Sequence, residues 1–200
     1  MKLLKKVSAV EVKRCFVMTY YMRKFGIAGK HDTKIPTREK YLTALKKSKN
    51  AVNNLNEKQL DKILSEHRQK RLVLYNAVSW HVGEVSTKEV GVWTGAGGLP
   101  LSWTNGTLFA TAEKVKTGLD KNSKKIRKRA KRAIPAIIVL KDIIKKEKYM
   151  FPIVFEGGIS AKRRTGPLKE SASIDDGNMR AIAFVISGDK KFKAYVGVRL

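Results

Sequence analysis

Apolar residues near the start of the chain recur at the spacing of an amphipathic helix. Ser8-Ala9-Val10-Glu11 has the spacing of a capping box, in which a serine hydroxyl and a glutamate carboxylate satisfy free amides of the first helical turn. Gly26 stands where such a helix would end. The pattern predicts a helix over about 9–25, although VKRCFVMTYY within it is also rich in residues that favour strands.

Two further helices are predicted before position 70. Ile35-Pro36-Thr37 introduces the second, which we expect to run to about Lys49. Asn56-Glu57-Lys58-Gln59 repeats the capping pattern for the third. The apolar face of the second helix consists of Tyr41, Leu42 and Leu45, and that of the third consists of Leu60, Ile63, Leu64 and His67.

From about Leu72 the pattern favours strands. LVLYNAVSWHV reads as one strand, and the stretch 91–111 joins a glycine-rich loop, TGAGGLP, to Asn105-Gly106, a pair typical of two-residue hairpins. The loop matches neither a Walker A loop nor Gly-x-Gly-x-x-Gly, so we interpret it as a hairpin connection between two core tryptophans, Trp93 and Trp103. If exposed, either tryptophan would instead be able to stack on a nucleic-acid base.

Strand and helix signals alternate in the last eighty residues. KNSKKIRKRAKR, at 121–132, predicts a basic helix that Ile134-Pro135 ends, and AIIVL follows as a short buried run. Residues 172–174 read as a strand, Asp175-Asp176-Gly177 as a tight turn, and NMRAIAFVIS as the start of a helix. The inward-facing residues of that helix are expected to be Met179, Ile182, Ala183 and Ile186.

Length and composition predict one compact domain. The chain has 200 residues, of which 42% are hydrophobic, enough to bury a sizeable core. Cys15 is the only cysteine, which excludes an intrachain disulfide and the usual cysteine-based zinc sites and favours a buried or half-buried thiol in a reducing compartment. No apolar run reaches the length of a membrane span, so we expect a cytoplasmic protein without a membrane partner.

Charge narrows the candidate partners. Forty-three Lys and Arg against seventeen Asp and Glu give a formal net charge of +26, which favours a polyanionic partner, DNA or RNA, over other ligands. An acidic protein partner is the alternative, and an ordinary solvated helical face is the plainest interpretation of the basic run. The candidate nucleic-acid-binding residues are Lys121, Lys124, Lys125, Arg127, Lys128, Arg129, Lys131 and Arg132, with Lys162, Arg163 and Arg164 as a second contact.

The turn SIDDGNMR, at 173–180, carries the candidate chemistry. A helix entered through Gly177 presents free amides to an anion, and Arg180 on its first turn adds a charged fork, so the two suit a phosphate. Asp175 and Asp176 would be repelled by that phosphate unless a divalent cation or arginines intervened. An ordinary strand-turn-helix with an aspartate cap explains the same residues equally well.

The surroundings of the turn resemble the core of the ParB/sulfiredoxin superfamily. LKDIIKKEKYMFPIVFEGG followed by SIDDGNMRAIAFVISGDKKFKAYVGV matches its pattern: a Leu-x-x-Ile helix, a Pro-Ile-Val strand, a strand ending in Asp-Gly-x-x-Arg, an Ala-bearing helix, a glycine and a last strand. The resemblance implies that Gly177, Asn178 and Arg180 bind phosphate. Met179 stands where the superfamily usually has His or Arg, and Asn178 replaces the cysteine of sulfiredoxins, which excludes sulfinic reductase chemistry.

The resemblance implies an α+β fold, a ParB/sulfiredoxin-like mixed sheet with flanking helices. We expect a single domain over 1–200, with a mainly helical extension at 1–70 and the core at 71–200. Small basic plasmid proteins of the Osa type, which inhibit the fertility of conjugative plasmids, are similar in size and charge and imply DNase or ATPase activity.

In that hypothesis Asp175, Asp176, Arg180 and Glu156 are the catalytic candidates. Asp175 and Asp176 would hold Mg²⁺, and ATP would be a substrate. The alternative is a basic DNA- or RNA-binding protein without catalytic activity, in which the turn is only structural.

Overall fold

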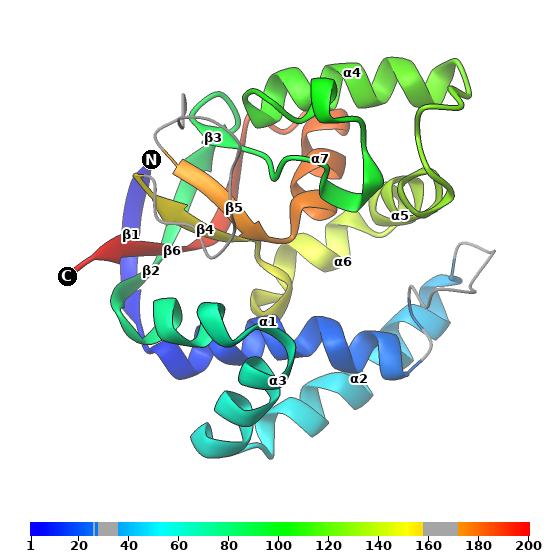
Figure 1. The fold of residues 1–200 in the computed structure, drawn as a ribbon. Coiled ribbons are helices and arrows are strands. Elements are labelled where there is room, and N and C mark those ends of the chain that lie inside the picture. The colour runs from blue at the N-terminus through cyan, green and yellow to red at the C-terminus, as the bar shows by residue number, and fades with distance from the viewer. Residues whose placement is uncertain (26, 28–35, 158–171) are drawn as a thin grey trace.

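The computed structural model describes residues 1–25, 27, 36–157 and 172–200, and within them the chain is a mixed α+β protein (Figure 1). A six-stranded sheet has the order β1-β2-β6-β4-β5-β3. Its strands are β1 (Lys2–Val7), β2 (Val78–Ser86), β3 (Val90–Gly91), β4 (Ile153–Glu156), β5 (Ala172–Asp176) and β6 (Lys191–Arg199). The pairs β4–β6 and β3–β5 are parallel, and the pairs β1–β2, β2–β6 and β4–β5 are antiparallel.

Helices cover both faces of the sheet (Figure 1). Because successive side chains of a strand point to opposite faces, Ile153 and Phe155 of β4 pack with Trp80 and residues of α1 and α3, whereas Val154 packs on the other side. That second side carries α4, α5 and α7, whose apolar residues form one cluster with it. The α-helices are α1 (Ala9–Lys24), α2 (Arg38–Asn53), α3 (Glu57–Asn76), α4 (Leu108–Asp120), α5 (Lys128–Val139), α6 (Lys141–Lys146) and α7 (Asn178–Ile186).

The three N-terminal helices form where the capping patterns predicted them. The Ser8 hydroxyl accepts a hydrogen bond from the amide of Glu11 at the start of α1, but the Glu11 carboxylate accepts from the hydroxyl of Tyr195, so the predicted box is only half formed. Asn56 and Gln59 form a reciprocal capping box at the start of α3. In α2, Tyr41 and Leu45 are buried as expected, but Leu42 is exposed. The side chain of His67 lies outside the described residues.

One feature of the first seventy residues was not predicted. β1 pairs with β2 at the edge of the sheet, so the N-terminal segment is part of the sheet as well as helical. Lys13 of α1, fully buried, ties this segment together through ion pairs with Glu57 at 2.9 Å and Asp61 at 2.6 Å on α3.

The prediction of a β-rich middle third is wrong in two places. Residues 72–76 complete α3, and the strand begins only at Val78. No hairpin forms at Asn105-Gly106: after two 3₁₀ turns, η1 (Ala96–Gly98) and η2 (Leu101–Trp103), Thr107 caps α4 by accepting a hydrogen bond from the amide of Ala110. Trp93 and Trp103 are half-buried rather than fully buried.

The basic run is not a single helix. α4 ends at Asp120, residues 121–127 form turns, and α5 begins at Lys128 and continues through Pro135. Pro135 therefore does not end the helix as predicted; the fully buried Ala130 and Ile134 anchor α5 to the core, and that packing offsets the hydrogen bond that proline cannot donate. Residues 136–139 of AIIVL are the last turn of α5, and Leu140 lies between α5 and α6. The prediction of a buried run is wrong, because only Leu140 within it is buried and Val139 is exposed.

The C-terminal elements follow the predicted order. The 3₁₀ turn η3 (Lys148–Met150) leads into β4, and β5 leads through Gly177 into α7. α7 ends at Ile186, and shortly after it Gly188 lies in the left-handed region, with φ 92°, and donates its amide to the carbonyl of Val185. Ile182 and Ala183 are buried as expected, and Met179 and Ile186 are half-buried.

Candidate anion-binding site

The turn between β5 and α7 depends on a glycine. Gly177 has φ 86° and is the N-cap residue of α7, where no side chain caps the helix. A Cβ atom at this position would lie 3.0 Å from the Cα of Pro152 and 2.8 Å from Nη2 of Arg180. Glycine is the residue that adopts this left-handed conformation without a clash between a Cβ atom and these neighbours. Because glycine has no side chain, the N-terminus of α7 has no side-chain cap.

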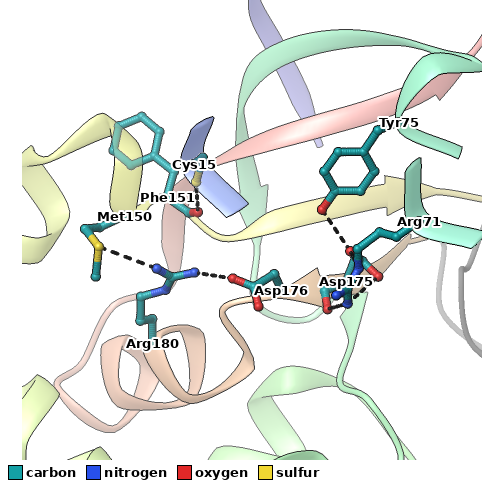
Figure 2. Close-up of polar contacts among 8 residues, drawn as sticks. All are labelled: Cys15, Arg71, Tyr75, Met150, Phe151, Asp175, Asp176 and Arg180. Atoms are coloured by element: carbon teal, nitrogen blue, oxygen red, sulfur yellow. Dashed lines mark hydrogen bonds and ion pairs between the residues drawn. The ribbon is translucent and has the colours of Figure 1, made fainter. Parts of the chain in front are cut away.

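The side chain of Asp175 is buried and points into the protein (Figure 2). Its carboxylate is 2.6 Å from Nε of Arg71, on α3, and also accepts hydrogen bonds from Nη2 of Arg71 and the hydroxyl of Tyr75 (Figure 2). The guanidinium of Arg71 stacks over the ring of Phe16 at 4.6 Å. Burial raises the pKa of Asp175, and Arg71 opposes that rise; burial and Asp175 together raise the pKa of Tyr75, which keeps its phenol a donor.

Asp176 pairs with the arginine of its own turn. Its Oδ2 atom is 2.8 Å from Nη2 of Arg180, one helical turn further along, and Nη1 of Arg180 lies 3.7 Å from the sulfur of Met150 (Figure 2). Arg180 is buried, with an exposed fraction of 5%. One side of its guanidinium is therefore held by a carboxylate, and the acceptor that the described residues place at the other side is a weak one, a thioether.

Asn178 holds the glycine-rich loop against the turn. Its Oδ1 accepts a hydrogen bond of 3.0 Å from the amide of Trp93. Gly97 of η1 has φ 61°, and a Cβ there would meet the sulfur of Met179 at 2.6 Å. The side-chain oxygen of Asn178 thus has a structural partner, and the glycine-rich loop packs on the first turn of α7.

Glu156 is not brought to the turn. In the antiparallel pair of β4 and β5, Glu156 lies opposite Ala172, whereas Ile153 lies opposite Asp176. The two positions on β4 are three residues apart along the strand, about 10 Å at the usual rise. Glu156 is also exposed, so the structure gives it no role beside Asp175 and Asp176.

The carboxylates of the turn do not fit a divalent cation. Both oxygens of Asp175 face Arg71 or Tyr75, and Oδ2 of Asp176 faces Arg180. Within the described part of the chain, no three His, Cys, Asp or Glu side chains are grouped as metal ligands. The expected Mg²⁺ ligands, Asp175 and Asp176, are instead paired with arginines.

A cavity of about 730 Å³ opens beside the turn, and it is lined by residues 175–180 together with parts of α1, α3 and α5. Among the described residues, five arginines and three carboxylates line it, a surplus of two positive charges. Its charged lining residues are Arg23, Glu66, Arg71, Arg129, Arg132, Asp175, Asp176 and Arg180.

Three of these arginines have no acidic partner within the described residues. Arg71 and Arg180 are paired with the two aspartates, whereas Arg23, Arg129 and Arg132 make no ion pair there; Arg132 donates only to the carbonyl of Lys128, at 3.3 Å. Partial withdrawal from water, together with repulsion by Arg129 and Arg180, lowers the pKa of Arg23. Arginines from two different helices, α1 and α5, therefore lie at the same cavity.

The basic run lies beside this cavity. Six of its eight cations are exposed, namely Lys121, Lys124, Lys125, Arg127, Lys128 and Arg129. Lys131 donates to the carbonyl of Asn122 and closes the turn between α4 and α5. Lys162, Arg163 and Arg164 lie outside the described residues.

Sequence reasoning missed Arg71, Tyr75 and Arg23. Arg71 and Tyr75 continue the apolar stripe that Leu60 and Leu64 begin on α3, so a charged residue on that stripe was the available signal for a buried ion pair. The prediction of a strand from Leu72 concealed it. Cys15 is fully buried as expected, its thiol meets the carbonyl of Phe151, and burial raises its pKa to about 12 (Figure 2).

Comparisons of the chain with protein-family models, with curated proteins and with solved structures found no significant match. Among the described residues, no helix is both long enough and apolar enough to cross a membrane.

Proposed function

We propose that this protein binds nucleic acid, with the basic run 121–132 on the phosphate backbone and the cavity beside the 175–180 turn as an anion site. The observation that carries the proposal is a set of arginines, Arg23, Arg129 and Arg132, that have no acidic partner among the described residues. They lie at a cavity whose described lining has a surplus of two positive charges. Surfaces that serve solubility alone usually intersperse both signs of charge. A surplus gathered at a concave site favours an anionic ligand.

The order of elements supports a relationship to the ParB/sulfiredoxin superfamily. The helix α6, the strands β4 and β5, the glycine turn, α7 and β6 follow one another as that pattern requires. We propose this superfamily fold for residues 140–198, and with it a phosphate at Gly177 and Arg180. One edge of the Arg180 guanidinium contacts the thioether sulfur of Met150. A phosphate oxygen is a stronger acceptor and would replace that contact.

Hydrolysis of a phosphodiester or of ATP is the second candidate function. Asp175, Asp176 and Arg180 line the same cavity, which is the observation in its favour. Their arginine pairs leave the carboxylates poorly placed to hold a metal ion or to orient water, so binding without catalysis is the function that the geometry supports better. Interference with conjugative transfer, as in Osa-type proteins, would require binding in either case.

A titration of labelled single- and double-stranded DNA over a range of salt concentrations tests the proposal. We expect the logarithm of the association constant to fall linearly with the logarithm of the salt concentration. Incubation of plasmid DNA, and separately of ATP, with and without Mg²⁺ decides the second candidate, with Arg180→Gln as the control for contaminating activity. Absence of binding even at low salt would refute the proposal, and turnover that Arg180→Gln abolishes would make hydrolysis the function.

A further inference from the structure

We propose that the cavity receives the end of a single nucleic-acid strand and binds its terminal phosphate monoester between Arg23 of α1 and Arg129 and Arg132 of α5. This inference rests on the proposed nucleic-acid binding and names the ligand class of the cavity. It places the terminal phosphate on arginines outside the 175–180 turn.

Charge complementarity favours a terminal over an internal phosphate. The ion pairs Arg71–Asp175 and Arg180–Asp176 neutralise four of the eight charged residues that line the cavity. Among the other described residues that line the cavity, Arg23, Arg129 and Arg132 are cationic and Glu66 is the one carboxylate, which leaves a surplus of two positive charges. A phosphate monoester carries roughly two negative charges at neutral pH, whereas each internal phosphodiester carries one.

The size and lining of the cavity suit a nucleotide rather than a bare phosphate. Its volume of about 730 Å³ is within the usual range of small-molecule sites. Tyr20 of α1 and Trp93 at the start of the glycine-rich segment contribute aromatic surface to its wall. Aromatic rings beside cations are the arrangement on which single-stranded nucleic acids stack their bases.

Continuity with the basic run favours a strand over a free nucleotide. Arg129 and Arg132 belong both to the run 121–132 and to the cavity wall, and the exposed Lys124, Lys125 and Lys128 precede them along the chain. Phosphates that follow the terminal nucleotide would therefore meet further cations as the strand leaves the cavity. A free nucleotide would use none of these lysines.

Binding of three otherwise identical single strands tests the inference: one with a 5′-phosphate, one with a 3′-phosphate and one with hydroxyls at both ends. We expect one of the phosphorylated strands to bind about tenfold more tightly than the unphosphorylated strand, as a charge-assisted contact requires. Arg23→Gln and Arg129→Gln should abolish that preference. Lys124 belongs to the basic run but does not line the cavity. Lys124→Gln should therefore weaken binding of all three strands equally and leave the preference for the phosphorylated strand unchanged.

The preference should also depend on pH. Because the second pKa of a phosphate monoester is about 6, the preference should shrink as the pH falls through that value, while binding of the unphosphorylated strand stays nearly constant. Salt-dependent binding without any preference would overturn the inference and leave the proposed function standing. Loss of all strand binding would refute both, and displacement of the phosphorylated strand by AMP at equal concentration would assign the cavity to free nucleotides and overturn the strand-end proposal.

Discussion

Two neighbouring aspartates in this protein have different partners because side chains alternate along a strand. Asp175 points to the face that carries α3 and meets Arg71 and Tyr75, and Asp176, at the end of β5, meets Arg180 of the following helix (Figure 2). The first pair is buried on both sides and links helix α3 to the turn. Asp175 therefore has a structural role that the sequence motif alone does not reveal.

Removal of Arg71 should destabilise the protein strongly. Arg71→Met leaves the carboxylate of Asp175 buried without its cation, which should lower the free energy of unfolding by about 3–5 kcal/mol in urea titrations. Addition of Asp175→Leu should restore part of the loss, since the lone buried charge is then gone. The matched control is Glu84→Gln, which breaks the exposed Lys191–Glu84 pair and should cost about 1 kcal/mol or less. Equal losses for Arg71→Met and Glu84→Gln would contradict the buried pair.

At the scale of elements, the turn that precedes α7 requires a left-handed residue. Gly177→Ala places a Cβ at φ 86° and against the backbone of Pro152, so it should lower the free energy of unfolding by about 1–3 kcal/mol. Gly106→Ala is the control, because Gly106 has no atom within 4 Å of an added Cβ and no positive φ, and its effect should lie within about 0.5 kcal/mol. Chemical denaturation of both variants measures the difference; a neutral Gly177→Ala would mean that the turn tolerates other conformations.

Helix starts were predictable where a side chain caps the backbone locally. Ser8 and Asn56 lie within three residues of the amides that they satisfy, and α1 and α3 begin there. α4 was missed because Asn105-Gly106 was given more weight than Leu108, Thr111, Ala112 and Val115, which recur at helical spacing and are all buried. A local turn preference of this kind loses to burial of a whole helical face.

Contacts across long stretches of sequence limited the prediction of the site. The strand, the glycine turn and α7 follow from residues 172–187 alone, and the structure has them. Arg71 lies 104 residues from Asp175, and Trp93 lies 85 residues from Asn178, so neither partner could be read from the motif. The same holds for β1, whose pairing with β2 depends on a segment more than seventy residues away.

At the scale of the whole molecule, a net charge of +26 raises the question of whether binding is local or diffuse. Figure 1 places β1, at one edge of the sheet, and α5 on opposite sides of the molecule. Lys2, Lys5 and Lys6 on β1 are exposed, as are Lys124, Lys125 and Lys128 of the basic run. Neutralisation of either set of three lysines lowers the net charge by the same amount. A comparison of the two variants therefore separates the effect of where the charges lie from the effect of total charge on DNA binding.

The triple variant of the run should lose a defined part of the salt dependence. Replacement of Lys124, Lys125 and Lys128 by Gln should reduce the slope of log association constant against log salt by about 2–3 for duplex DNA, since each phosphate contact contributes about 0.9. The same replacement of Lys2, Lys5 and Lys6 should change the slope by less than about 1. If both variants lowered the slope equally, the DNA would respond to the overall field of the protein and not to a contact surface. The basic run would then have no special role in DNA binding. Any preference among nucleic-acid ends would have to come from the cavity alone.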